Sequence, residues 1–234
     1  MKPQISVVIP ALDEEESIAA VVRACLATGL PDEVIVVDNG SADGTFERAQ
    51  AAGARVVTTA RGYGRACAAG VAAADSRSEI LVFLDGDGSD CPELMEQLVR
   101  PIAQDEADFV MGSRTRGVRE PGSMNFQQVF AGRFAGWLLR LLYGVKYSDM
   151  CPFRAIRRRT LEGLGMREQT FGWNLEMQMR AAQAGLRILE IPVDHRCRMG
   201  GESKVSGSLR GTLIAGMRIG ATLIRVAAEG RKSD

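Results

Sequence analysis

The stretch EILVFLDGDGSD (residues 79–90) joins a run of apolar residues to a loop of small and acidic ones. A short, unbroken apolar run is typical of a strand that is buried on both faces, as the strands of a parallel sheet are. The oxygen-bearing side chains that follow this run belong to Asp85, Asp87, Ser89 and Asp90. Because carboxylates so close together repel one another, the loop indicates a cation site at the end of a central strand.

The same alternation of strand and helix patterns fills the first half of the chain. Apolar, β-branched runs predict strands at residues 5–10, 33–38, 54–59, 79–85 and 107–113. Helical patterns lie between them, at residues 15–29, 44–52, 65–75 and 92–104. This order predicts an α/β fold, Rossmann-like, with a mostly parallel central sheet flanked by helices. We expect a single domain over residues 1–228 and a disordered tail at 229–234.

Composition narrows the class of function. The formal net charge of the 234 residues is zero, which argues against a general nucleic-acid-binding protein. Residues 1–50 hold nine acidic and three basic residues, whereas residues 196–234 hold eight basic and three acidic ones. This asymmetry indicates an anion site near the C-terminal part. The five cysteines are widely spaced and form no CxxC pair, which favours reduced thiols, as in the cytosol, over disulfides or a zinc site.

Ligands of parallel sheets bind where the strands end and the loops gather. The loops that we expect at this edge are PALDEEE (10–16), DNGSADGT (38–45), ARGYGR (60–65) and DGDGSD (85–90). All four are polar, and three contain glycine. The sequence therefore predicts that they converge on one binding site.

The acidic loop fits a hard divalent cation. Mg²⁺ and Mn²⁺ take one or two carboxylates together with waters and substrate phosphates, and Asp85 and Asp87 offer two carboxylates, with Ser89 beside them. A calcium-binding EF-hand is excluded because Asp90 stands where that loop requires glycine and a strand precedes it. We also expect Asp90 to cap the helix that begins at Pro92, although a cap does not account for Asp85 and Asp87.

The other loops suit a nucleotide. Asp38 and Asn39 have side chains of a kind that can bind a nucleobase edge or a ribose hydroxyl; a plain Asx turn followed by a helix N-cap is the alternative. A dinucleotide fingerprint is disfavoured because Cys67 stands in place of the third glycine. Arg61 and Arg65 flank the same loop and suit a diphosphate.

The motifs together resemble a known family. SVVIPALDEEESI, VVDNGSADGT, RGYGRACAAG, FLDGDGSDCPE and MGSR occur in the order and spacing of family 2 glycosyltransferases, and the resemblance covers roughly residues 5–215. DMCPFRAIRR, FGWNLEMQMRAAQAGLRILEIPV and GGESKVSGS resemble the branch of dolichol-phosphate mannosyltransferases and polyprenyl-phosphate glucosyltransferases. The resemblance implies a GT-A fold, a nucleoside-diphosphate-sugar donor, a divalent metal (Mg²⁺ or Mn²⁺) and inverting sugar transfer.

The resemblance also implies roles for individual residues. The nucleotide-sugar site that it implies, together with the two arginines of the ARGYGR loop, comprises Pro10, Ala11, Asp13, Glu14, Asp38, Asn39, Arg61, Arg65 and Asp85. Asp85 and Asp87 match the DXD metal motif, and Ser89 is the third implied ligand. The chain departs from the family pattern at Asp13, Asn39, Tyr63 and Ser89.

The later half is expected to bind the acceptor. We divide the domain into a nucleotide-sugar-binding half (1–113), an acceptor half (114–207) and a C-terminal helix (208–228). The predicted catalytic residues are Asp149, Glu176 and Arg114. A hydroxyl acceptor needs a carboxylate base, whereas a phosphate acceptor is already anionic and needs cations. The residues expected to hold a phosphate are Arg154, Arg196, Arg198, Ser203 and Lys204. A capping turn for Asp149 and a helix-surface position for Glu176 are the structural alternatives.

An apolar stripe bears on membranes. Its members, with two flanking arginines, are Phe130, Arg133, Phe134, Trp137, Leu138, Arg140, Leu141 and Leu142. This spacing is typical of an interfacial helix and equally of a helix that packs in a core. Residues 209–229 form a second candidate. No segment approaches the ~18 apolar residues of a spanning helix. We expect a cytoplasmic protein, with peripheral contact to the cytoplasmic face of the membrane left open.

These observations favour an inverting, metal-dependent glycosyltransferase that uses a UDP- or GDP-sugar and a polyprenyl phosphate or another phosphate-bearing or lipid-linked acceptor. A non-catalytic nucleotide-sugar-binding or scaffold protein is the first alternative. A nucleotidyltransferase is the second, and it is disfavoured because its basic, glycine-rich loop near the N-terminus is replaced by the acidic DEEE.

Overall fold

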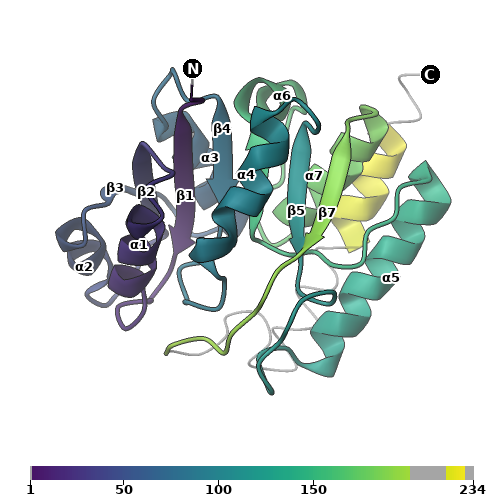
Figure 1. Ribbon diagram of the computed structural model, residues 1–234. Helices are drawn as coiled ribbons and strands as arrows, with labels where there is room; N and C mark the ends of the chain where they lie inside the picture. Colours follow the sequence, from purple (N-terminus) through teal and green to yellow (C-terminus); the bar gives the residue numbers. More distant parts are fainter. Residues whose placement is uncertain (1, 201–219, 230–234) are drawn as a thin grey trace.

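A computed structural model describes residues 2–200 and 220–229 of the chain (Figure 1). The strands are β1 (Ile5–Ala11), β2 (Glu33–Asp38), β3 (Arg55–Thr58), β4 (Ile80–Phe83), β5 (Phe109–Ser113), β6 (Arg154–Arg157) and β7 (Ile188–Pro192). The helices are α1 (Ile18–Ala27), α2 (Thr45–Ala51), α3 (Tyr63–Ala73), the 3₁₀ turn η1 (Pro92–Leu94), α4 (Met95–Ala103), α5 (Phe126–Tyr143), α6 (Arg158–Gly163) and α7 (Trp173–Gln183). Residues 220–229 form a further helix.

The seven strands form one sheet in the order β3-β2-β1-β4-β6-β5-β7. Strands β1, β2, β3 and β4 pair in parallel, as do β5 and β7, and β6 runs antiparallel to both of its neighbours. The predicted single α/β domain with a mostly parallel sheet is therefore confirmed. The sequence reasoning missed β6 and β7, because RAIR and ILEIP are short and carry charged residues.

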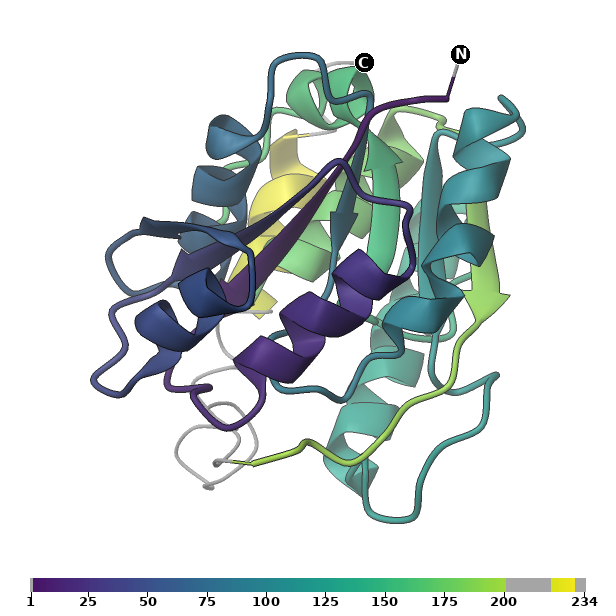
Figure 2. The same ribbon diagram turned by 60° about the vertical axis from the view of Figure 1, so that its left-hand side comes forward.

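Helices cover both faces of the sheet (Figures 1 and 2). Successive residues of β1 point to opposite layers: Val7 and Ile9 pack with residues of α1, α2 and α4, whereas Val8 packs with residues of α3, α5 and α7. Burying one such side chain contributes about 1.5–3 kcal/mol, which accounts for strands that are apolar on both faces.

The strand ends meet at one edge, as expected. Parallel pairing places Ala11 beside Asp38, and Asp38 beside Thr58. The loops that follow β1, β2 and β3 therefore leave the sheet together, and the loop that follows β4 joins them, because β4 runs parallel to β1.

Helix α5 turns its large apolar side chains outward. Ala135 and Leu139 are buried against the body of the domain, whereas the side chains of Phe130, Phe134 and Trp137 are exposed. The core-packing interpretation of this stripe is therefore wrong for the aromatic residues. Among the helices of the described residues, none is long and apolar enough to cross a membrane.

Within its described residues, 220–229, the C-terminal region differs from the prediction at one residue. The expected helix at 208–228 is helical over its described part, residues 220–228, and residues 208–219 lie outside the described residues. Glu229, assigned to a disordered tail, continues the helix and forms an ion pair with Arg180. Residues 230–234 also lie outside the described residues.

Candidate functional site

The loops after β1 and β2 are joined by hydrogen bonds. Asp13 adopts a left-handed backbone (φ 51°), its N–H donates to Ser41 Oγ at 2.9 Å, and its Oδ1 accepts from the Ala42 N–H at 2.8 Å. The Glu14 N–H donates to Thr45 Oγ1 at 2.8 Å. These bonds hold a left-handed non-glycine residue, which costs about 1–3 kcal/mol in isolation. Asp13 therefore fixes how the loops after β1 and β2 lie against each other.

Asp38 and Asn39 are both buried at the end of β2. Asp38 Oδ1 accepts from the Ser41 N–H, three residues on, at 3.0 Å, so this local bond spans one residue more than the Asx turn that is the structural alternative. Asn39 Oδ1 accepts from the Gly62 N–H at 2.9 Å. An amide oxygen serves for this bond as well as a carboxylate does, so Asn39 ties the loop after β3 to the loop after β2.

The loop at residues 168–170 lies against the start of α3. Arg61 is exposed there, whereas Arg65 is half-buried and its Nη2 donates to Gln169 Oε1 at 2.6 Å. A Cβ at Gly64 would collide with the Glu168 carbonyl oxygen, so only glycine permits this approach. Sequence reasoning did not find this contact, because no local signal links residues a hundred positions apart.

The acidic loop collects carboxylates around Asp85. Tyr63 Oη donates to Asp85 Oδ1 at 3.0 Å, and Ser89 donates to Asp87 Oδ1 from its N–H (2.9 Å) and its Oγ (2.6 Å). Asp90 Oδ2 accepts from the Asp85 N–H at 3.0 Å. Asp90 therefore closes its own loop, and the expected cap is wrong: no side chain caps η1 at Pro92.

The carboxylates of the acidic loop are wholly or partly buried and close to one another, which disfavours their negative charges. Burial, followed by the charges of Asp87 and Asp90, raises the pKa of Asp85 well above its usual range. Burial also raises the pKa of Asp90 to about 7. Two buried atoms that face each other at 4.0 Å, Asp90 Oδ1 and His195 Nδ1, lack hydrogen-bond partners within the described part of the chain. A bound cation would relieve the repulsion among the carboxylates of Asp85, Asp87 and Asp90.

The donor atoms suit Mg²⁺ or Mn²⁺ in particular. In the described ranges, no three Asp, Glu, His or Cys side chains form a complete metal cage. Ions of this kind need only one or two carboxylates when a substrate diphosphate and waters supply the remaining ligands. Asp85 and Asp87 fit that requirement, and Ser89 Oγ is directed at Asp87.

Arg198 supplies a positive charge among these acids. Its Nη2 donates to Glu14 Oε1 at 2.7 Å, and its Nη1 lies 3.8 Å from Asp87 Oδ2. Arg198 is predicted to bind the acceptor, and the structure places it beside the acids of the first and fourth loops. Arg196 forms an exposed ion pair with Glu93. Ser203 and Lys204 lie outside the described residues.

Arg114 and Asp149 form a buried, two-pronged ion pair. Arg114 Nε and Nη2 each donate to an Asp149 oxygen at 2.8 Å, and the Arg114 N–H donates at 2.9 Å. Burial acts to raise the pKa of Asp149, but the hydrogen bonds and charge of Arg114 outweigh it and hold that pKa below its usual range. A carboxylate so stabilised is a weak base.

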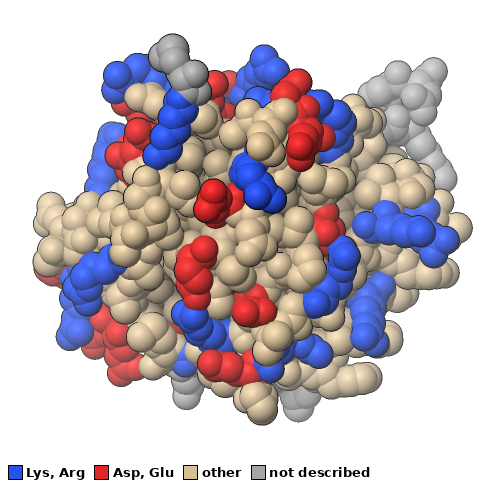
Figure 3. Space-filling model, viewed as in Figure 1, with Lys and Arg blue, Asp and Glu red and all other residues tan. Residues whose placement is uncertain are grey.

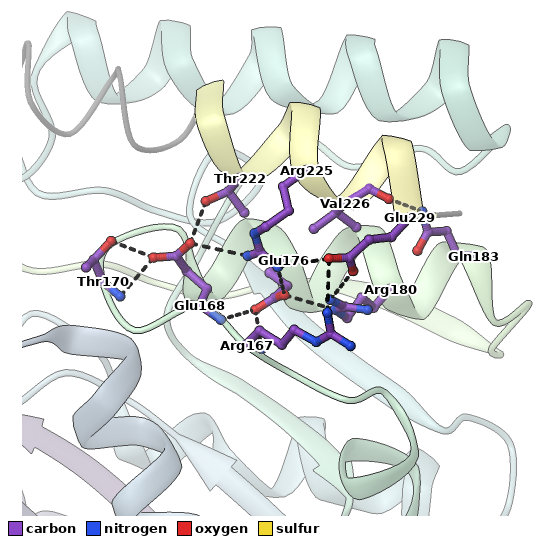
Figure 4. A network of polar contacts seen from close by, with 10 residues as sticks. All are labelled: Arg167, Glu168, Thr170, Glu176, Arg180, Gln183, Thr222, Arg225, Val226 and Glu229. Atoms are coloured by element: carbon purple, nitrogen blue, oxygen red, sulfur yellow. Dashed lines mark hydrogen bonds and ion pairs between the residues drawn. The ribbon is translucent and has the colours of Figure 1, made fainter. Parts of the chain in front are cut away.

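Glu176 is the centre of a second polar network (Figure 4). Its Oε2 accepts from the N–H groups of Arg167 (3.0 Å) and Glu168 (2.6 Å). Its Oε1 accepts from Arg180 Nε (2.9 Å) and Arg225 Nη1 (3.0 Å). Glu176 is fully buried, so the helix-surface alternative is wrong, and all its strong acceptor sites are occupied. It joins α7, the loop at 167–168 and the helix at 220–229.

Arg154 corrects an expectation about the acceptor. Its side chain is 0% exposed and donates to the carbonyl oxygens of Cys151 and Asn174, with the guanidinium 5.9 Å from the centre of the Phe109 ring. A group enclosed in this way has no surface for a phosphate. Arg154 therefore supports the main chain beneath the site and does not bind the acceptor in this conformation.

Comparisons with known proteins agree with this architecture. The family model for "Glycosyl transferase family 2" matches residues 6–165. An uncharacterized glycosyltransferase of Mycobacterium tuberculosis is 40% identical over 218 residues, which cover 90% of this chain and 94% of that protein. An undecaprenyl-phosphate mannosyltransferase of Micrococcus luteus is 30% identical over 228 residues, covering 90% of this chain and 91% of that protein.

A solved structure extends the likeness to three dimensions. Glucosyl-3-phosphoglycerate synthase from Mycobacterium tuberculosis, in complex with Mn²⁺, UDP-glucose and phosphoglyceric acid, superposes with a TM-score of 0.78. It is 26% identical, and the alignment covers 97% of this chain and 80% of that one. The expected GT-A fold is confirmed. Among the classes that the sequence left open, these findings select a sugar-transferring enzyme: the chain belongs to glycosyltransferase family 2.

Proposed function

We propose that the chain is an inverting, metal-dependent glycosyltransferase that moves a sugar from a UDP- or GDP-sugar to the phosphate of a polyprenyl phosphate. The observation that carries the donor half of this proposal is the crowding of Asp85, Asp87 and Asp90, with one buried carboxylate oxygen that has no partner in the described residues. A related synthase holds Mn²⁺ and UDP-glucose, which supports the same donor chemistry.

The donor site lies in the proposed nucleotide-sugar-binding half, residues 1–113. Asp85 and Asp87, assisted by Ser89, would hold Mg²⁺ or Mn²⁺, and such an ion would supply positive charge that stabilises the diphosphate as a leaving group. The other residues proposed to line this site are Pro10, Ala11, Asp13, Glu14, Asp38, Asn39, Arg61 and Arg65.

The acceptor is proposed to be a phosphate because neither predicted base is free. Asp149 is held by Arg114, and Glu176 is held by two N–H groups and two arginines. A phosphate oxygen attacks without losing a proton, so no base is required. The undecaprenyl-phosphate mannosyltransferase of Micrococcus luteus supports a polyprenyl chain on that phosphate.

The reaction balances without a proton transfer. An acceptor phosphate oxygen forms a bond to the anomeric carbon from the face opposite the diphosphate. The bond between that carbon and the diphosphate oxygen breaks, and its electron pair leaves with the nucleoside diphosphate. In the acceptor half, residues 114–207, we assign the binding of anions to Arg196, Arg198, Ser203 and Lys204, while Asp149 positions Arg114.

Nucleotide binding tests the donor assignment. UDP and GDP are added with and without Mn²⁺ to the wild type, Asp87→Ala and the surface control Glu162→Ala, and thermal unfolding is measured. A ligand at about 100 times its Kd adds roughly 2.7 kcal/mol of stability. We expect a metal-dependent rise with one nucleotide in the wild type and the control, and none in Asp87→Ala. No rise with either nucleotide would overturn the donor site.

Product analysis tests the acceptor and the stereochemistry. The enzyme is supplied with the donor so identified and with undecaprenyl phosphate, and the product is characterised by NMR. We expect a sugar phosphodiester of inverted anomeric configuration. Retained configuration would overturn the direct displacement, and transfer only to hydroxyl acceptors would overturn the phosphate assignment.

A further inference from the structure

The outer face of α5 carries a continuous row of large apolar side chains. We call Phe126, Phe130, Phe134, Trp137 and Leu141 the aromatic stripe. Each of the five is between 53% and 82% exposed. Neighbouring rings along the stripe lie 6.2, 6.3 and 6.0 Å apart between centroids. Such a contiguous exposed apolar patch marks an interaction surface.

The inner face of α5 prevents the stripe from turning inward. Gly132, Ala135, Gly136 and Leu139 are buried on that side, and a Cβ at Gly136 would collide with the Tyr147 carbonyl oxygen. The helix is thus pressed against the body along its small residues. Its 18 residues, about 27 Å in length at 1.5 Å per residue, hold the stripe outward.

The charge on α5 indicates what the stripe meets. The helix contains no Asp or Glu, and its two arginines, Arg133 and Arg140, are both exposed. At 100° per residue they lie along one flank of the stripe. In Figure 3 Lys and Arg side chains are spread over this face of the molecule, and several of them lie at the right, where α5 lies in Figure 1. An apolar face bordered by cations fits a surface of anionic lipid headgroups.

We propose that the aromatic stripe docks the enzyme on the surface of a membrane that contains anionic lipids. A second copy of the chain fits less well, because two facing stripes would bring Arg133 and Arg140 of both copies together with no carboxylate on either helix to pair them. Lipid phosphates pair with arginines and accept aromatic rings between their chains.

The purpose of membrane docking rests on the proposed function, the transfer of a sugar to a polyprenyl phosphate. A Cβ at Gly132 would lie 3.5 Å from Asp149 Oδ1, so α5 packs directly on the Arg114–Asp149 pair. A membrane held against the opposite face of this helix lies next to the acceptor half. The phosphate of a lipid-linked acceptor is then presented beside the site without leaving the bilayer.

Vesicle sedimentation without nucleotide tests the docking surface. Vesicles of phosphatidylcholine, with and without phosphatidylglycerol, are mixed with the wild type, Phe130→Ser/Trp137→Ser, Arg133→Gln/Arg140→Gln and the control Leu26→Ser on the distant helix α1. We expect the wild type and Leu26→Ser to bind the anionic vesicles. The aromatic variant should lose about tenfold or more in partition coefficient, and the arginine variant should lose the dependence on phosphatidylglycerol and on salt.

Fluorescence locates the contact. The chain has two tryptophans, and Trp173 is only 3% exposed, so quenching by brominated lipids reports Trp137. We expect quenching in the wild type. Equal vesicle binding by the wild type and Phe130→Ser/Trp137→Ser, or no quenching, would overturn the proposal. A dimer in sedimentation velocity that the same variant abolishes, with no vesicle binding, would assign the stripe to a second copy and overturn it as well.

The two proposals fail separately. Phe130→Ser/Trp137→Ser should keep the metal-dependent stabilisation by nucleotide, because its substitutions lie outside the donor loops. If the wild type binds vesicles but no nucleotide, only the proposed function is overturned. Intact nucleotide binding with no vesicle binding would overturn the docking surface alone.

Discussion

The acidic loop at residues 85–90 and the network around Glu176 both gather carboxylates beside arginines, yet they are completed in opposite ways. In the network, Glu176 meets two N–H groups, Arg180 and Arg225, and its carboxylate is fully used. In the loop, Arg198 Nη1 lies 3.8 Å from Asp87 Oδ2, and the charge of Arg114 does not outweigh the burial that raises the pKa of Asp85 and Asp90. Asp90 Oδ1 has no partner among the described residues. A satisfied buried network is a scaffold, whereas an unsatisfied one points to a ligand.

The largest effect is expected from breaking the scaffold. Glu176→Ala leaves Arg180, Arg225 and two N–H groups without their acceptor, so we expect a loss of about 3–5 kcal/mol in the free energy of unfolding. Urea denaturation measures it, with the exposed ion-pair variant Glu162→Ala as the control, for which we expect less than about 1 kcal/mol. A near-neutral Glu176→Ala would show that the network is not structural.

A smaller, pH-dependent effect is expected at the Arg114–Asp149 pair. Asp149→Asn removes a carboxylate whose pKa is lower in the folded protein than in the unfolded chain. The stability that it contributes is present above the unfolded pKa, about 3.9, and is lost as pH falls through the folded pKa. We expect the variant to be less stable by about 2–4 kcal/mol at pH 7 and the difference to shrink below about pH 4.

Urea denaturation of the wild type and Asp149→Asn across this range measures that difference. Asp149→Glu, which keeps the charge but not the two-pronged geometry, should recover part of the loss at pH 7. A difference that does not depend on pH would show that the carboxylate charge contributes nothing.

The smallest effect should have the opposite sign. Asp85→Asn removes a charge that burial, Asp87 and Asp90 disfavour, so we expect the metal-free protein to gain about 1 kcal/mol. Asp43→Asn is the matched control. Burial acts to raise the pKa of Asp43, but hydrogen bonds from Thr45 and neighbouring N–H groups hold it below its usual range, so this variant should lose stability. Thermal unfolding in a chelating buffer compares the two, and a loss in both would remove the contrast between loop and network.

The layout of the donor half can be predicted from local sequence patterns alone. Unbroken apolar runs signalled strands buried on both faces, and the polar loops after them had to meet at one edge, because parallel strands end on the same side. These features are local, so they could be read from short segments such as EILVFLDGDGSD. The placement of Asp85 and Asp87 at a strand end follows directly from them.

The burial and the partners of each side chain depend on contacts between distant segments. The sequence predicts Arg154 as a phosphate ligand. In the fold, its buried side chain donates to the carbonyl oxygen of Asn174, twenty residues away. The sequence predicts Glu176 as a base. In the fold, its carboxylate accepts a hydrogen bond from Arg225, forty-nine residues further along the chain. The apolar period of α5 is the same in a core helix as in an exposed one. In the fold, the face with Gly136 packs closely on Tyr147 and the aromatic rings face outward. Burial and pairing depend on which distant segments fold against a residue, and local periodicity carries no record of that.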